Sequence, residues 1–173
     1  MNKNFIPFCV AKSIYDLPLT FYHKHHIKTV FVDLDNTLDA YNKLNPSSRA
    51  INLVNNFKKE KINVIIVSNN KLSRVRPYAS KLDVPFLNSL RKPLLYKMRR
   101  FLKKEKIKID EAILIGDQLI TDILFANRLK MKNVLVAKLV KEDQWTTKIN
   151  RLFDKRRYKK LQKQQLLVSW EEK

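Results

Sequence analysis

Carboxylates, a serine, a lysine and a glycine stand directly after short apolar runs at four places in the sequence. They are Asp33 near the end of KTVFVDL (28–34) with Asp35 just beyond it, Ser68 at the end of INVIIVS (62–68), Lys92 after VPFLNS (84–89), and Gly116 and Asp117 at the end of AILIGD (112–117). Two neighbouring carboxylates and a third from another segment can bind a hard cation such as Mg²⁺, which prefers oxygen ligands. A carboxylate beside such a cation can also attack phosphorus, and a second carboxylate can move the proton.

The remaining polar residues suit the same chemistry. The Ser68 hydroxyl can hold a phosphate oxygen, and Lys92 can neutralise charge around a nucleophile and a phosphoryl group. Gly116 is the only glycine in 173 residues, whereas average usage of about 7 % would give roughly a dozen. It therefore marks a backbone position where no side chain fits.

The apolar runs alternate with helical patterns. Runs at 28–34, 62–68, 112–117 and 133–139, and a weaker one at 84–89, have the near-continuous apolar character of strands buried on both faces. Helices are predicted at 47–61, 72–82, 93–106 and 119–130. This alternation predicts an α/β fold, a doubly wound and mostly parallel sheet of five or six strands. Because parallel strands end at one edge, the polar residues above are expected to share that edge.

Two helices carry more detailed predictions. In 47–61, Ser47 or Ser48 is expected to cap the helix, with Ile51, Val54 and Phe57 on its buried face. In 93–106, Pro93 is expected to open the first helical turn.

Four motifs in order resemble those of the haloacid dehalogenase-like (HAD-like) phosphatases, subclass IIIA. They are DLDNTL (33–38), VSNN (67–70), Lys92-Pro93 and GDQLITD (116–122). The resemblance spans roughly residues 28–137, and in detail it is to the YqeG-like family, which the segment KLVKEDQWTTKINRLFD (138–154) also resembles. It implies a Rossmann-like HAD fold and a Mg²⁺-dependent phosphomonoester hydrolase with an aspartyl-phosphate intermediate.

The resemblance implies a role for each matching residue. For catalysis, these are Asp33 as nucleophile, Asp35 as general acid and base, and Lys92 as the cation that stabilises the aspartyl-phosphate. Phosphate would be bound by Ser68, Asn69 and Lys92. Mg²⁺ would be bound by Asp33, Asp117 and the main-chain carbonyl of Asp35, with Asp122 acting through water or as an orienting group. Thr37 and Gly116 would support the site.

The intervals between motifs are short. Neither 38–61 nor 70–91 has room for the cap domain that many relatives insert there. A capless site is open, so it suits a large phosphorylated substrate or a second copy of the chain acting as a lid. The family includes mitochondrial relatives that dephosphorylate phosphatidylglycerophosphate, which makes a membrane-borne phosphate a candidate substrate.

The net charge of +20 offers an alternative. Nine Lys or Arg lie in 91–108, and KRRYKKLQK (155–163) holds six, without an acid. Anionic partners are expected: phosphate, RNA or a membrane surface. The competing hypothesis is therefore a basic RNA-, ribosome- or membrane-binding module on the same fold.

Length and composition suit one domain with a good-sized core. We predict a capless domain over 1–140 and a basic helical extension over 141–173, starting near Gln144, with LLVSW (166–170) as an apolar latch. There is no apolar run of about 18 residues and no apolar signal-peptide core, and the single Cys9 fits a reducing compartment. We expect a cytoplasmic protein, with peripheral contact to a membrane as an alternative. The three histidines of HKHH (23–26) are expected in a surface loop rather than a metal site.

Overall fold

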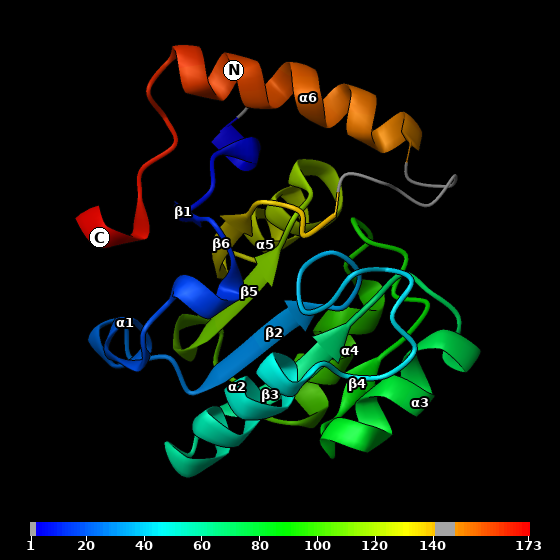
Figure 1. Ribbon diagram of the computed structural model, residues 1–173. Coiled ribbons are helices and arrows are strands. Elements are labelled where there is room, and N and C mark those ends of the chain that lie inside the picture. Colours follow the sequence, from blue (N-terminus) through cyan, green and yellow to red (C-terminus); the bar gives the residue numbers. More distant parts are fainter. Residues whose placement is uncertain (1–2, 141–147) are drawn as a thin grey trace.

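The computed structural model describes residues 3–140 and 148–173, and it contains a six-stranded sheet (Figure 1). The strands are β1 Cys9–Ala11, β2 Thr29–Asp33, β3 Asn63–Val67, β4 Phe86–Leu87, β5 Ala112–Gly116 and β6 Lys132–Val136. Their order is β1-β6-β5-β2-β3-β4, and every neighbouring pair is parallel. The predicted α/β fold with a mostly parallel sheet of five or six strands is confirmed.

Helices cover both faces of this sheet. The helices of the described residues are α1 Leu19–Lys24, α2 Ser48–Lys59, α3 Leu72–Leu82, α4 Tyr96–Lys104, α5 Leu124–Arg128 and α6 Lys148–Lys163, of which α1 to α5 pack on the sheet. Val30 and Val32 of β2 pack in one core with residues of α1, α2 and α3, whereas Phe31 packs in a second core with residues of α4 and α5. Because side chains alternate along a strand, these cores lie on opposite faces. The sheet is therefore doubly wound.

The direction of winding reverses at β2. From β2 the chain proceeds to β3 and β4 on one side, and then returns to β5 and β6 on the other side. The carboxyl ends of β2 and β5 therefore flank the switch point, where α/β sheets place ligands. Between β2 and β3 the helical element is α2, and between β3 and β4 it is α3. No cap domain interrupts residues 3–140.

Two strand predictions need correction. β1 was not anticipated, because it is three residues long and pairs with β6, more than 120 residues away in sequence. The weak run VPFLNS forms a strand only at Phe86–Leu87.

Three helix predictions also need correction. Ser47 caps α2 by accepting from the Ala50 N–H at 3.3 Å, as expected, but Ile51 is 40 % exposed and Ala50 takes its place on the buried face. Pro93 does not open a helix, because α4 begins at Tyr96 and the preceding residues form a turn.

The predicted helix over 119–130 opens instead as a π-helix, Leu119–Ile123, followed by α5. The Asp122 and Ile123 N–H groups both donate to the Gln118 carbonyl, at 3.1 and 3.2 Å. This sharing widens the first turn. It also determines where the Asp122 side chain points.

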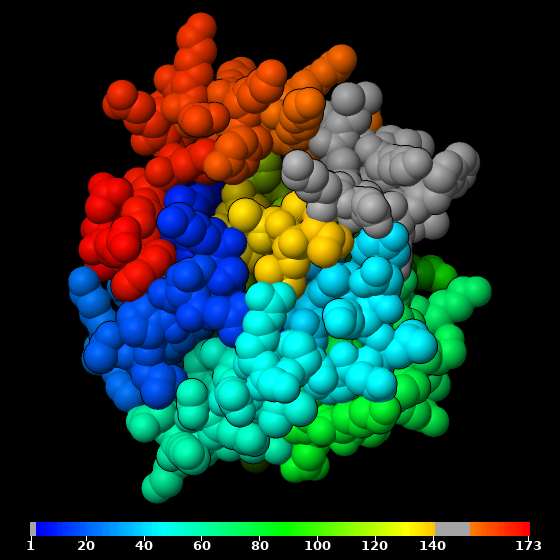
Figure 2. All heavy atoms as spheres, viewed as in Figure 1, coloured from blue at the N-terminus to red at the C-terminus, as the bar shows by residue number. Residues whose placement is uncertain are grey.

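The C-terminal segment packs onto the start of the chain, as Figure 2 shows for its orange and red residues against the blue ones. The Val10 N–H donates to the Val168 carbonyl at 2.9 Å, and Trp170 stacks edge-on against Phe21 at 6.2 Å between ring centroids. The predicted apolar latch is confirmed by these contacts. The predicted helix start near Gln144 and the domain boundary at 140/141 involve residues outside the described ranges.

The prediction that the three histidines share one surface loop is wrong. His23 lies in α1, and His25 follows its last turn, edge-on to Phe8 and Phe21 at 5.1 and 4.8 Å between ring centroids. The 3–140 and 148–173 ranges hold no helix that is both long and apolar enough to cross a bilayer.

Candidate active site

Asp33 is the last residue of β2 and lies at the switch point of the sheet. Val32 is in register with Ile115 of β5, so Asp33 and Gly116 end their strands at the same level. Asp33 is 8 % exposed. The carboxylate is thus largely shielded from bulk water at the one edge where two diverging crossovers leave a crevice.

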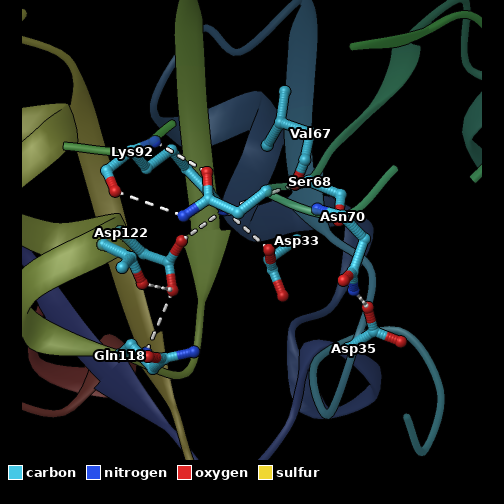
Figure 3. A network of polar contacts seen from close by, with 10 residues as sticks. Asp33, Asp35, Val67, Ser68, Asn70, Lys92, Gln118 and Asp122 are labelled. Atoms are coloured by element: carbon cyan, nitrogen blue, oxygen red, sulfur yellow. Dashed lines mark hydrogen bonds and ion pairs between the residues drawn. The ribbon is translucent and has the colours of Figure 1, made fainter. Parts of the chain in front are cut away.

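Lys92 joins two of the predicted site carboxylates (Figure 3). Its Nζ lies 2.6 Å from Asp33 Oδ1 and 2.7 Å from Asp122 Oδ1, and it also donates to the Val67 carbonyl at 3.3 Å. The lysine side chain is 1 % exposed. The structure thus places this lysine beside Asp33, which lies 59 residues earlier in the chain.

Charge is finely balanced around these groups. Burial raises the pKa of Asp33 well above its usual value, the Asp122, Asp117 and Asp35 carboxylates raise it further, and Lys92 opposes them. Burial alone would lower the pKa of Lys92, but Asp122 and Asp33 outweigh it, so the pKa of Lys92 is raised and the ammonium stays charged. Additional positive charge at this edge would stabilise the ionised Asp33.

Asp35 is held by two residues of the next crossover. Arg74 Nη2 lies 2.7 Å from Asp35 Oδ1, and Asn70 Nδ2 donates to Asp35 Oδ2 at 2.5 Å. Sequence reasoning missed Arg74. The one available signal was a cation in the first turn of α3, where the helix dipole disfavours positive charge unless an acid lies nearby.

Ser68 and Asn69 follow β3 and lie beside the lysine. Ser68 is 2 % exposed, and its Oγ accepts from the Asn70 N–H at 3.0 Å. The Asn69 side chain accepts from the Lys92 N–H at 2.6 Å and donates to the Lys92 carbonyl at 3.2 Å. In this structure Asn69 therefore fixes the lysine backbone, and its predicted phosphate contact stays a prediction.

Gly116 is required by a close approach rather than by backbone conformation, because its φ is not positive. A Cβ at this position would lie 2.4 Å from Asp122 Cγ. The Asp122 carboxylate is fully buried and also accepts from the Gln118 N–H at 3.1 Å. The glycine thus makes room for the carboxylate that orients Lys92.

The oxygens at this edge fit a hard divalent cation. Asp117 follows β5 and lies near enough for its charge to act on Asp33 across the switch point. Asp122 is engaged by Lys92 and Gln118, which suits an orienting or water-mediated role. Among the described side chains, no three Asp, Glu, His or Cys groups converge as a ready-made metal cluster. Two carboxylates and a main-chain carbonyl of Asp35 would therefore have to supply the ligands.

Thr37 lies fully buried in the turn after β2, and its hydroxyl has no hydrogen-bond partner among the described residues. The neighbouring Asn36 has a positive φ of 68° and donates its N–H to the Asp39 carbonyl at 2.7 Å. This tight turn positions Asp35 between the end of β2 and α3.

Sequence comparison agrees with the site. The chain belongs to the family described as mitochondrial PGP phosphatase, whose sequence model matches residues 1–141. It is also 32 % identical over 172 residues to the probable phosphatase YqeG of Bacillus subtilis, covering 99 % of each chain. The chain is therefore a phosphatase of the HAD superfamily, and the predicted family and enzyme class are confirmed.

Solved structures share the fold at lower sequence identity. A 3-deoxy-D-manno-octulosonate 8-phosphate phosphatase from Yersinia pestis matches with a TM-score of 0.52 and 14 % identity, over 74 % of this chain and 83 % of that chain. An uncharacterised protein from Listeria monocytogenes serotype 4b matches with a TM-score of 0.55 and 14 % identity, over 68 % and 85 % of the two chains. These likenesses concern the fold.

Proposed function

We propose that this phosphatase hydrolyses phosphomonoesters through an aspartyl-phosphate on Asp33, with Mg²⁺ as its cofactor. The contact between Lys92 Nζ and Asp33 Oδ1 at 2.6 Å carries the proposal. It places a buried cation on one oxygen of the nucleophile, and we assign the other oxygen, Oδ2, to the attack on phosphorus.

The residues divide the chemistry between two steps. Asp33 forms a bond to phosphorus while the bond to the leaving oxygen breaks, and Asp35 gives that oxygen its proton. Asp35 then removes a proton from a water molecule, which attacks phosphorus and releases phosphate and free Asp33. Lys92 compensates charge throughout, because Asp122 holds it beside the nucleophile.

Mg²⁺, held by Asp33, Asp117 and the Asp35 carbonyl, would neutralise phosphate oxygens as a Lewis acid. Burial and the nearby carboxylates raise the pKa of Asp33, and a bound cation would offset both, which supports this assignment. Magnesium is the hard-cation choice for a small set of oxygen ligands completed by water and substrate.

For the substrate, we propose a large or lipid-borne phosphomonoester such as phosphatidylglycerophosphate. The family description supports this class, as does the absence of a cap domain over 3–140. The family membership supports this enzyme rather than the binding module that the charge alone suggested.

Turnover of an aryl phosphate by the Asp33→Asn protein tests the reaction. We expect loss of activity by about 10³-fold or more, since removing a catalytic nucleophile typically leaves only binding and electrostatic effects. Chelator is expected to abolish wild-type activity and added Mg²⁺ to restore it. Asp110→Asn is the control, because Asp110 is exposed and lies just before β5, at the opposite edge of the sheet from Asp33. An Asp33→Asn protein as active as this control would refute the proposal.

A further inference from the structure

Large apolar side chains are exposed around the mouth of the active site. Of the seven most exposed in the described ranges, four lie in the segments that directly follow β2, β3 and β4. They are Leu44 at 74 %, Leu72 at 38 %, Leu94 at 58 % and Tyr96 at 75 %. We call these four side chains, with segments 40–48, 69–77 and 88–100, the rim. Figure 1 shows these segments at the arrowhead ends of the strands.

The rim is built on ordered structure. Asp39 closes the loop that carries Leu44 by accepting from the Ser47 N–H at 2.8 Å and from the Tyr78 hydroxyl at 2.5 Å. Leu72 is the first residue of α3. The backbone that carries Leu44 and Leu72 is therefore held by hydrogen bonds, and exposed large apolar side chains gathered on one side of a protein often mark an interaction site.

The rim also lies next to the chemistry. Leu94 follows Lys92 by two residues, and Lys92 contacts Asp33. Arg74, which holds Asp35, also donates to the Tyr41 carbonyl in the loop before Leu44, at 3.4 Å. A surface that binds the rim therefore lies next to Asp33.

The charge of the rim is one-sided. Its three segments contain nine Lys or Arg and no Asp or Glu. Exposed cations such as Lys43, Lys71, Arg91 and Lys97 stand beside the apolar side chains. Exposed Leu and Tyr interspersed with Lys and Arg are the combination that binds an anionic bilayer interface, where each kind of contact alone is weak.

We propose that the rim docks this phosphatase onto an anionic membrane surface, with Leu44, Leu72, Leu94 and Tyr96 among the lipid headgroups. The rim's exposed cations then face lipid phosphates, and the sheet edge that carries Asp33 faces the plane in which a lipid phosphomonoester lies. The proposal rests on the proposed function for its biological sense. Its binding component is measured without any turnover.

The basic helix α6 is the competing surface. Residues 155–163 carry six cations, yet Leu161 is buried against the N-terminal segment and Arg157 lies over the Phe5 ring at 4.5 Å. The exposed apolar side chains Phe153 and Tyr158 belong to this helix, and Ile51 belongs to α2. These three residues lie outside the rim segments, so replacing them provides a control for the loss of exposed apolar side chains as such.

The test is co-sedimentation with vesicles of phosphatidylcholine, with and without phosphatidylglycerol. The rim variant is Leu44→Ser/Leu94→Ser/Tyr96→Ser and the control variant is Ile51→Ser/Phe153→Ser/Tyr158→Ser. Wild type and control are expected to bind the anionic vesicles. The rim variant is expected to bind about tenfold or more weakly, since interfacial affinity scales with buried apolar area.

Soluble aryl phosphate turnover separates this proposal from the proposed function. The rim variant is expected to keep wild-type turnover, because its substituted side chains are exposed whereas Asp33, Lys92 and Asp122 are buried. The single Tyr96→Ser protein serves if the triple variant melts early. Wild type that ignores anionic vesicles, or a rim variant that binds as tightly as wild type, overturns the proposal. Loss of binding on neutralising 155–163 alone also overturns it. Vesicle binding without aryl phosphatase activity would instead overturn the proposed function.

Discussion

Gly116→Ala tests how closely the site is packed. The added Cβ would meet Asp122 Cγ at 2.4 Å, Cβ at 2.5 Å and Oδ2 at 2.6 Å. Contacts this short force Asp122 to move, yet that side chain is fully buried and held by Lys92 at 2.7 Å and Gln118 at 3.1 Å. The substitution must therefore strain the core, weaken both contacts, or do both.

The magnitude follows from these contacts. Overpacking costs about 1–3 kcal/mol. Loss of a hydrogen bond to a charged group costs about 1.5–3 kcal/mol. A Gly-to-Ala change returns about 0.4–1 kcal/mol by restricting the unfolded chain. We therefore expect a net loss of about 1.5–5.5 kcal/mol in the free energy of unfolding.

Urea denaturation in the presence of chelator measures this loss without a contribution from metal. The control is the same change in an Asp122→Gly background, where all three atoms that the added Cβ would meet are absent. There we expect Gly116→Ala to cost less than about 0.5 kcal/mol, so that the two sites are strongly coupled. Additive effects of the two substitutions, or a harmless Gly116→Ala in the wild type, would refute the packing argument.

Two further predictions concern the C-terminal helix and the buried thiol. Asp154→Ala is expected to lower the free energy of unfolding by about 2 kcal/mol and to speed hydrogen exchange at Leu119 and Ile120. The reason is that the Asp154 carboxylate accepts from both N–H groups, at 3.1 and 3.2 Å; unchanged exchange there, relative to exposed Asp110→Ala, would contradict it. Burial raises the pKa of Cys9 to about 12, with Lys173 opposing it, so the folded thiol is protonated from pH 7 to 10. A disulfide reagent at pH 8 should therefore react only after unfolding, and rapid native-state labelling would show that Cys9 is accessible.

Much of the fold could be predicted from local sequence. β2, β3, β5 and β6 lie within the predicted runs or one residue beyond them, because strands buried on both faces are apolar throughout. β1 gives no such signal, since its three residues are stabilised by β6 and by the C-terminal Val168, both distant in sequence. The turn at Pro93 was misread because proline suits a helix start and a turn equally well.

The site divides in the same way. Asp33, Lys92 and Gly116 could be expected at one edge because each follows or ends an apolar run, and Asp122 was implied by the family resemblance. The structure brings these residues into contact or close approach. The partner of Asp35 could not, because an arginine in a chain with 36 Lys and Arg carries little information until α3 is placed beside the β2 turn. The role of Asn69 toward the Lys92 backbone likewise depends on the tertiary turn.

The most direct measurement of the central claim is detection of phosphate on Asp33. The Asp35→Asn protein, incubated with Mg²⁺ and p-nitrophenyl phosphate, should still form the intermediate, because this leaving group needs little protonation. It should then hydrolyse the intermediate slowly, because the base that activates water is absent. After acid quenching, mass spectrometry should find a phosphoryl group on the peptide containing Asp33, labile to hydroxylamine, and none in Asp33→Asn. Turnover by the wild type with the phosphoryl group on another residue, or on none, would contradict the assignment of Asp33 as nucleophile.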